Sequence, residues 1–100
     1  KAKSGGLFDK VYVSAKSTAF TAAVGYTYLI NTGTAVTVTL PSAVTNAAIV
    51  FKDSAGTAAT NNITINRADS ATIDGATSQA VGSNYGSMKL ISDGTNWFIT

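Results

Sequence analysis

The sequence predicts an all-β fold, a compact antiparallel β-sandwich, barrel or prism of about eight short strands. Helix formers are scarce, because the 100 residues contain no glutamate while threonine and other β-branched residues recur along the chain. Apolar and polar residues alternate with a period of two, which is typical of strands with one buried face. Turn signals separate these segments at intervals of roughly eight to twelve residues, the spacing of a small all-β domain.

Three segments in the first half of the chain have strand character. Residues 8–14 and 25–30 are rich in apolar, aromatic and β-branched residues, and the two tyrosines of the second segment would share one face. In residues 36–40, valine and leucine alternate with threonine, which predicts one buried and one wetter face. Pro41 then ends this strand, because proline has no amide hydrogen for a β-ladder.

Further strand segments in the second half lead to a closing hairpin. They are residues 48–52, 62–66 with Ile63 and Ile65 inward, 71–74 closed by Gly75, 78–82, 87–91 and 96–100. The last two flank Asp93-Gly94, a dipeptide that strongly favours a β-hairpin because glycine readily adopts a positive φ. No repeat of fixed period is visible along the chain, so a solenoid is not expected.

Positive charge is concentrated at the N-terminus, although the net charge of the chain is only +2. The first sixteen residues contain four lysines, opposed only by one aspartate: Lys1, Lys3, Lys10 and Lys16 against Asp9. With the flexible Gly-Gly pair at positions 5–6, this pattern predicts an N-terminal arm or attachment segment (residues 1–17) followed by an all-β module (residues 18–100). The arm could contact an acidic surface or nucleic acid, or it could be a solvated terminus.

The composition argues against catalysis and cofactor binding. The chain has neither cysteine nor histidine, which removes disulfides, thiolate ligands, the commonest zinc ligands and the hydrolase triad. Asp69 and Asp74 are the closest pair of carboxylates, but turn chemistry explains Asp74 and Asp93, since glycine follows each of them. We therefore expect no enzyme, no cofactor and no metal. The absence of an apolar run of about eighteen residues also argues against membrane insertion.

Two groups of aromatic residues are candidates for binding. Trp97 and Ile99 would lie on one face of the last strand and Phe98 on the other, which predicts either a central strand or a contact with a neighbouring subunit. The four tyrosines could stack on sugars or bases, or be ordinary half-buried sheet residues: Tyr12, Tyr26, Tyr28 and Tyr85. Basic residues are not interleaved with them, so nucleic-acid binding is not expected.

The order of several short motifs resembles a bacteriophage virion-surface β-module of the capsid-decoration, head-fibre or tail-fibre type. After a tyrosine-containing strand come Val-Thr-Val-Thr-Leu-Pro-Ser-Ala at 36–43, a strand ending Lys52-Asp53, Asn-Ile-Thr-Ile at 62–65, Thr-Ile-Asp-Gly at 72–75 and Ser-Asp-Gly-Thr-Asn-Trp at 92–97. The resemblance covers about four fifths of the chain. It implies a structural protein of the virion surface, usually a homotrimer, without catalytic activity.

Within this class, the short chain with a basic arm favours a capsid decoration subunit, a cement or head-fibre protein, attached to the major capsid protein or another virion protein. The candidate trimer interface is Trp97, Phe98 and Ile99. The candidate capsid-contact residues are Lys1, Lys3, Phe8, Lys10 and Lys16. The alternative is a tail-fibre tip or a receptor- or glycan-binding module, with the loops at Asn61-Asn62 or at residues 83–86 facing a host-surface glycan.

Overall fold

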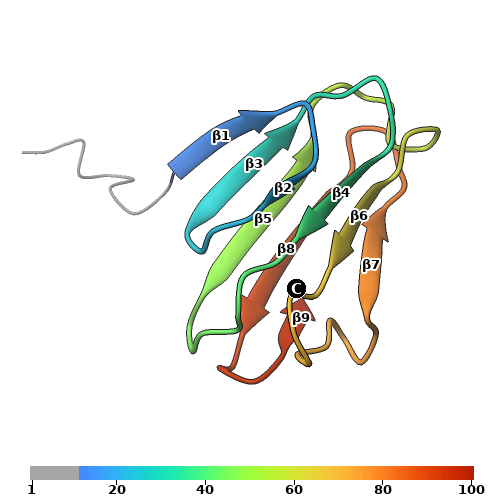
Figure 1. Cartoon of the computed structure of the whole chain (residues 1–100). Helices are drawn as coiled ribbons and strands as arrows, with labels where there is room; N and C mark the ends of the chain where they lie inside the picture. Colours follow the sequence, from blue (N-terminus) through green and yellow to red (C-terminus); the bar gives the residue numbers. More distant parts are fainter. Residues whose placement is uncertain (1–11) are drawn as a thin grey trace, which may run out of the picture.

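A computed structural model of the chain describes residues 12–100, and these fold into two β-sheets that lie one over the other (Figure 1). Within this range there is no helix. The first sheet contains β1 (Tyr12–Lys16), β3 (Tyr26–Ile30), β5 (Ala48–Asp53), β8 (Ser87–Ser92) and β9 (Trp97–Ile99), in that order. The second sheet contains β2 (Phe20–Thr21), β4 (Val36–Thr39), β6 (Ile63–Asn66) and β7 (Ser78–Val81). The predicted all-β class is confirmed, and both sheets are open, so the architecture is a sandwich and not a barrel.

The predicted antiparallel arrangement is wrong for the first two thirds of the described chain. From β1 to β6 the chain alternates between the two sheets, and each strand pairs in parallel with the strand two places further on: β1 with β3, β2 with β4, β3 with β5 and β4 with β6. Only β6–β7, β5–β8 and β8–β9 are antiparallel. From β1 to β6 the chain therefore winds as a short coil with two strands in each turn, one in each sheet. The last three strands, β7, β8 and β9, then add to the two sheets by antiparallel pairing.

The coil explains why the sequence showed neither parallel pairing nor a repeat. Parallel neighbours need a crossover connection, which is most often a helix. In this fold the crossover is a strand in the opposite sheet, so no helical segment marks it. Successive strands of the first sheet begin at residues 12, 26 and 48, and this unequal spacing leaves no period in the sequence.

The core lies between the sheets and follows the predicted alternation. In β4, Val36 and Val38 are buried while Thr37 is exposed, and in β6 the buried residues are Ile63 and Ile65, as predicted. The largest fully buried side chains come from both sheets and the adjoining loops: Trp97, Phe51, Ile30, Leu40, Ile49, Ile63, Ile65, Ile73, Leu90 and Val38.

The segment at residues 71–74 forms a tight turn and not a strand. Ile73 and Ala76 exchange backbone hydrogen bonds, with N···O distances of 2.8 and 3.0 Å, around the two residues Asp74 and Gly75. Both of these have positive φ, 50° and 83°, as a two-residue hairpin turn that matches the strand twist requires. Ile73 also bridges to Trp97, so this turn lies beside β9.

The predicted closing hairpin is confirmed, although its turn is wider than a two-residue one. β8 and β9 pair antiparallel from Ser92–Trp97 outward, which leaves a four-residue loop, 93–96. The Asp93 carboxylate accepts the N–H groups of Asn96 and Thr95, both at 2.9 Å. These two bonds, Asn96 first, hold the pKa of Asp93 below its usual value, and Gly94 supplies the positive φ of 96°.

Candidate functional site

The aspartates of the described residues accept hydrogen bonds from backbone N–H groups and do not pair with one another. Asp69 accepts the N–H of Ala71 at 3.0 Å, and Asp74 accepts the N–H of Ile99 at 3.2 Å. The fifth aspartate of the sequence, Asp9, lies outside the described residues. Residues 12–100 also hold no group of three or more side chains suited to bind a metal ion, and no helix long and apolar enough to span a bilayer.

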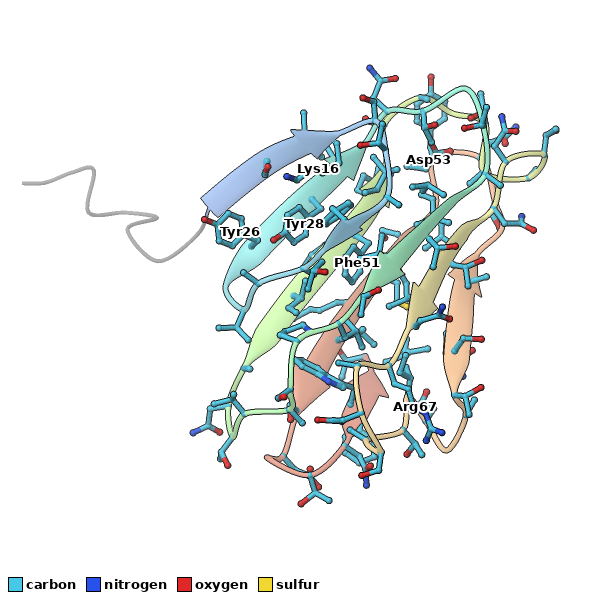
Figure 2. The ribbon with its side chains drawn as sticks, viewed as in Figure 1. Lys16, Tyr26, Tyr28, Phe51, Asp53 and Arg67 are labelled. Atoms are coloured by element: carbon cyan, nitrogen blue, oxygen red, sulfur yellow. The ribbon has the colours of Figure 1, made fainter. Side chains whose placement is uncertain are left out.

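Asp53 is the most deeply buried carboxylate of the described chain, with 2% of its surface exposed. It lies at the end of β5, beneath the loops at one end of the sandwich (Figure 2). One carboxylate oxygen, Oδ1, accepts the N–H groups of Ala55 at 3.1 Å and Gly56 at 3.0 Å. The other, Oδ2, accepts those of Ala58 at 2.9 Å and Tyr85 at 3.0 Å. A single side chain thus binds four backbone amides.

These four hydrogen bonds decide the ionisation state of Asp53. Burial by itself would raise the pKa of this carboxyl, because it disfavours the charged form. The amides, that of Ala58 foremost, outweigh burial and hold the pKa of Asp53 below its usual 3.8. The buried group is therefore a charged acceptor at neutral pH, and hydrogen bonds to a charged acceptor are stronger than those to a neutral one.

The carboxylate joins two loops that are remote in the sequence, which we call the Asp53 loop cluster (residues 54–60 and 83–86). A further bond between the loops runs from the Ala59 N–H to Asn84 Oδ1, at 3.0 Å. Lys52, an outward residue of β5, donates to the carbonyl oxygen of Tyr85. Sequence reasoning did suggest loop 83–86 as a contact with the host, but it missed that Asp53 ties this loop to residues 54–60.

A signal for Asp53 was nevertheless present in the sequence. Ile49, Phe51 and Asp53 have the same parity in β5, and all three are buried. A carboxylate in phase with the apolar face of a strand must find hydrogen-bond donors, because an unpaired buried charge is costly. Three of the four donors, the N–H groups of Ala55, Gly56 and Ala58, belong to the turn-forming residues that follow it.

The candidate trimer-interface residues have different environments. Trp97 is 1% exposed and packs in the core of its own sandwich. The prediction of a central strand is nevertheless wrong, because β9 is the edge strand of the first sheet, and the core covers only the face of β9 that carries Trp97. Phe98 and Ile99 are 39% and 37% exposed. Phe98 is the cross-strand neighbour of Ile91, which is itself 40% exposed, so the two form an apolar patch on the outer face of the first sheet.

The backbone of Trp97 brings together two of the motifs on which the family resemblance rests. The Trp97 N–H donates to the carbonyl of Thr72 at 2.8 Å, and Asp74 N–H donates to the carbonyl of Trp97 at 3.0 Å. The side-chain oxygen of Asn96 accepts the N–H of Thr72 at 2.8 Å and its hydroxyl at 3.2 Å. The Thr-Ile-Asp-Gly and Asn-Trp segments thus form one interlocked unit.

Four of the five candidate capsid-contact residues lie outside residues 12–100, and the fifth, Lys16, belongs to β1. Lys1, Lys3, Phe8 and Lys10 lie outside the described residues, as do residues 8–11 of the first predicted strand. Lys16 is the last residue of β1, which pairs with β3 as part of the first sheet, and its ammonium lies 5.2 Å from the centroid of the Phe20 ring. Attachment to a capsid through residues 1–17 stays a prediction.

Two of the tyrosines belong to an aromatic row between the sheets, visible in Figure 2. The rings of Tyr26 and Tyr28 stack at 5.2 Å, and Tyr28 lies 5.8 Å from Phe51 and 4.7 Å from Phe20 of the second sheet. The Tyr28 hydroxyl accepts the N–H of Ala23 at 2.8 Å. This row is part of the packing between the sheets, as expected of sheet tyrosines. Tyr85, by contrast, is 61% exposed.

An all-β sandwich whose described carboxylates all bind backbone amides has the features of a structural module. The sequence matches the family model described as "Bacteriophage T4 gp9/10-like protein, N-terminal" over residues 2–96. The chain therefore belongs to this family, which is one of bacteriophage structural proteins, and its location is accordingly virion-associated. A search of curated proteins finds no match.

Proposed function

We propose that this protein is a non-enzymatic subunit of the virion surface that forms a homotrimer and decorates the capsid, as a cement or head-fibre protein does. Membership of a phage structural family is the observation that carries the proposal. The uses of Asp53, Asp69, Asp74 and Asp93 support the non-enzymatic role, because each is engaged with backbone amides.

The proposed trimer contact is the apolar patch of Ile91 and Phe98 on the outer face of the first sheet. Ile99 pairs with the buried Leu90 and lies on the other face of β9, so it is not part of this patch. Trp97 is left out because it is buried within its own subunit. A stable interface buries about 600–1,000 Å² on each partner, and a subunit of a trimer makes two such contacts. Against the 5262 Å² of accessible surface of this chain, that is roughly a quarter to two fifths. Such burial would add substantially to the small core of a domain of this size.

The test is the native mass of the full chain, measured by light scattering during size exclusion at several concentrations. We expect a concentration-independent trimer. The double variant Ile91→Lys with Phe98→Lys should elute as a monomer with an unchanged circular dichroism spectrum, because desolvating two ammonium groups in an interface is unfavourable. The matched control is Val44→Lys, a 53% exposed apolar residue in a loop, which should stay trimeric. A monomeric wild type contradicts the proposed assembly.

The alternative is a tail-fibre location, with the module at the tip of a fibre or as a receptor- or glycan-binding module. It is favoured by the family description, which names the N-terminal part of its proteins, since a module with that position belongs to a longer polypeptide. Immunogold labelling of intact virions with an antibody against the module separates the two placements. Gold on the head supports decoration, whereas gold confined to the tail rules decoration out. If virions bind a variant lacking residues 1–16 as well as wild type, the arm is not the attachment segment.

A further inference from the structure

Tyr85 combines exposure with an unfavourable backbone conformation. Its side chain is 61% exposed, yet its φ is 59°, in the left-handed region that bulky residues rarely adopt. A residue held in this region costs on the order of 1–3 kcal/mol and persists only where the surrounding structure imposes it. Glycine or asparagine would satisfy the same turn at a lower cost.

The contacts around Tyr85 hold both its backbone and its ring. Its N–H donates to Asp53 Oδ2 at 3.0 Å, and its carbonyl accepts from Lys52. The ring lies against Gly56, where a Cβ would come within 2.5 Å of Cε2 and Cζ and 2.8 Å of the hydroxyl oxygen. Gly56 is itself bound to Asp53 through its N–H, at 3.0 Å, and has a φ of 77°. One buried carboxylate therefore positions the aromatic ring and the glycine against which it packs.

The residues next to this ring are polar and largely uncharged. Asn84 is exposed, and its Oδ1 accepts the N–H of Ala59. This bond fixes the orientation of the Asn84 side-chain amide, so its Nδ2 donors point away from Ala59. Lys52 is already engaged with the carbonyl of Tyr85. A rigid aromatic ring beside an oriented amide suits a sugar, whose C–H faces pack on the ring while its hydroxyls bind the amide. Because the ring is held before any ligand arrives, little conformational entropy is lost on binding.

We propose that the Asp53 loop cluster is a binding site for a pyranose glycan, with Tyr85 as the stacking ring and Asn84 as the hydrogen-bonding amide. Within residues 12–100, Lys52 is the cation that contacts Tyr85, and its ammonium is already bound to the carbonyl oxygen of that residue. This disfavours a nucleic acid, whose binding depends on several phosphate contacts. The site lies at the loop end of the sandwich (Figure 2), and its occupation requires neither the trimer nor a particular location on the virion.

The experiment is an NMR titration of the full-length, ¹⁵N-labelled chain with a panel of methyl pyranosides and N-acetylglucosamine. The sugar concentration is raised to several times a dissociation constant in the millimolar range. At least one sugar should shift the amide signals of Gly56, Asn84, Tyr85 and Gly86 in a saturable way. Tyr85→Phe should retain these shifts because it keeps the ring. The matched control Val44→Ala, which truncates an exposed apolar residue in the loop before β5, at the other end of that strand from Asp53, should respond as wild type does.

Tyr85→Asn separates a binding role from a structural one. Asparagine tolerates positive φ, so the unfolding midpoint of this variant should be equal to or above that of wild type, while the sugar-induced shifts should be lost. The proposal is overturned if no sugar of the panel shifts these amides in wild type, or if Tyr85→Asn keeps the shifts. It is also overturned if Tyr85→Asn lowers the midpoint markedly, because tyrosine would then be explained by stability.

Discussion

Replacing the buried Asp53 by asparagine tests whether one carboxylate organises the loop end of the sandwich. Asparagine has nearly the same shape, but it has one acceptor oxygen where aspartate has two, and it turns an NH₂ group toward the other pair of backbone donors. Its oxygen should face Ala58, which is 1% exposed, and Tyr85. The amides of Ala55 and Gly56 would then lose their acceptor.

The expected loss of stability follows from the number of orphaned donors. A buried donor without a partner costs about 1–3 kcal/mol, and the lower end applies here because Ala55 and Gly56 are partly exposed to water. Two such donors give a loss of about 2 kcal/mol for Asp53→Asn. For a domain of this size, that lowers the melting temperature by roughly 8–16 °C. Asp53→Ala, which removes both oxygens, should cost about 3–5 kcal/mol.

The dependence on pH provides a second readout of the same contact. The folded pKa of Asp53 lies below its usual 3.8, so its ionised form stabilises the fold above that value. This contribution should be lost as the pH falls through the lowered folded pKa. The difference in unfolding free energy between wild type and Asp53→Asn should therefore be constant near neutrality and shrink in strong acid.

Urea denaturation followed by circular dichroism at a series of pH values measures both effects. Asp69→Asn is the matched control, since Asp69 is exposed and accepts a single backbone N–H; it should cost about 1 kcal/mol or less. A change within about 0.5 kcal/mol of wild type for Asp53→Asn would refute the role assigned to the carboxylate. So would a loss that persists undiminished in strong acid.

Two further pairs of variants test the last hairpin. Trp97→Ala should lower the unfolding free energy by about 3–5 kcal/mol because it empties a core position. Val44→Ala, at an exposed loop position outside the proposed trimer contact, should cost about 1 kcal/mol or less, and equal losses in chemical denaturation would contradict this division. Gly94→Ala should cost about 1–3 kcal/mol of unfolding free energy, since the φ of Gly94 is 96° and a Cβ there would meet the Thr45 hydroxyl. The control Gly33→Ala, with open space around it, should change the melting temperature little. A tolerated Gly94→Ala would show that the loop can rearrange.

The local pattern of the sequence was enough to predict most of the strands, and the buried face of those with a clear alternation. It did not reveal the short β2, and it predicted a strand at 71–74 where the chain forms a turn. The alternation in β4 and β6 was read correctly because the period of two is a local property of an extended chain. The closing hairpin was likewise predicted, since its two strands are adjacent in the sequence and joined by a turn of recognisable composition. The location of the tightest turn was misjudged, because Asp-Gly at 74–75 and at 93–94 look alike locally and differ only in the strand register around them.

The pairing of the strands and the composition of the candidate site depend on the folded arrangement of the chain. Parallel pairing of β1 with β3 and of β4 with β6 depends on contacts between segments that are distant in the sequence, and alternation is the same for parallel and antiparallel neighbours. Trp97, Phe98 and Ile99 are all apolar, so only the stacking of the second sheet shows which face of β9 is inside. Asp53 and Tyr85 are 32 residues apart, and only the folded sandwich brings them together, because the loops that contain them meet at the same end of the two sheets.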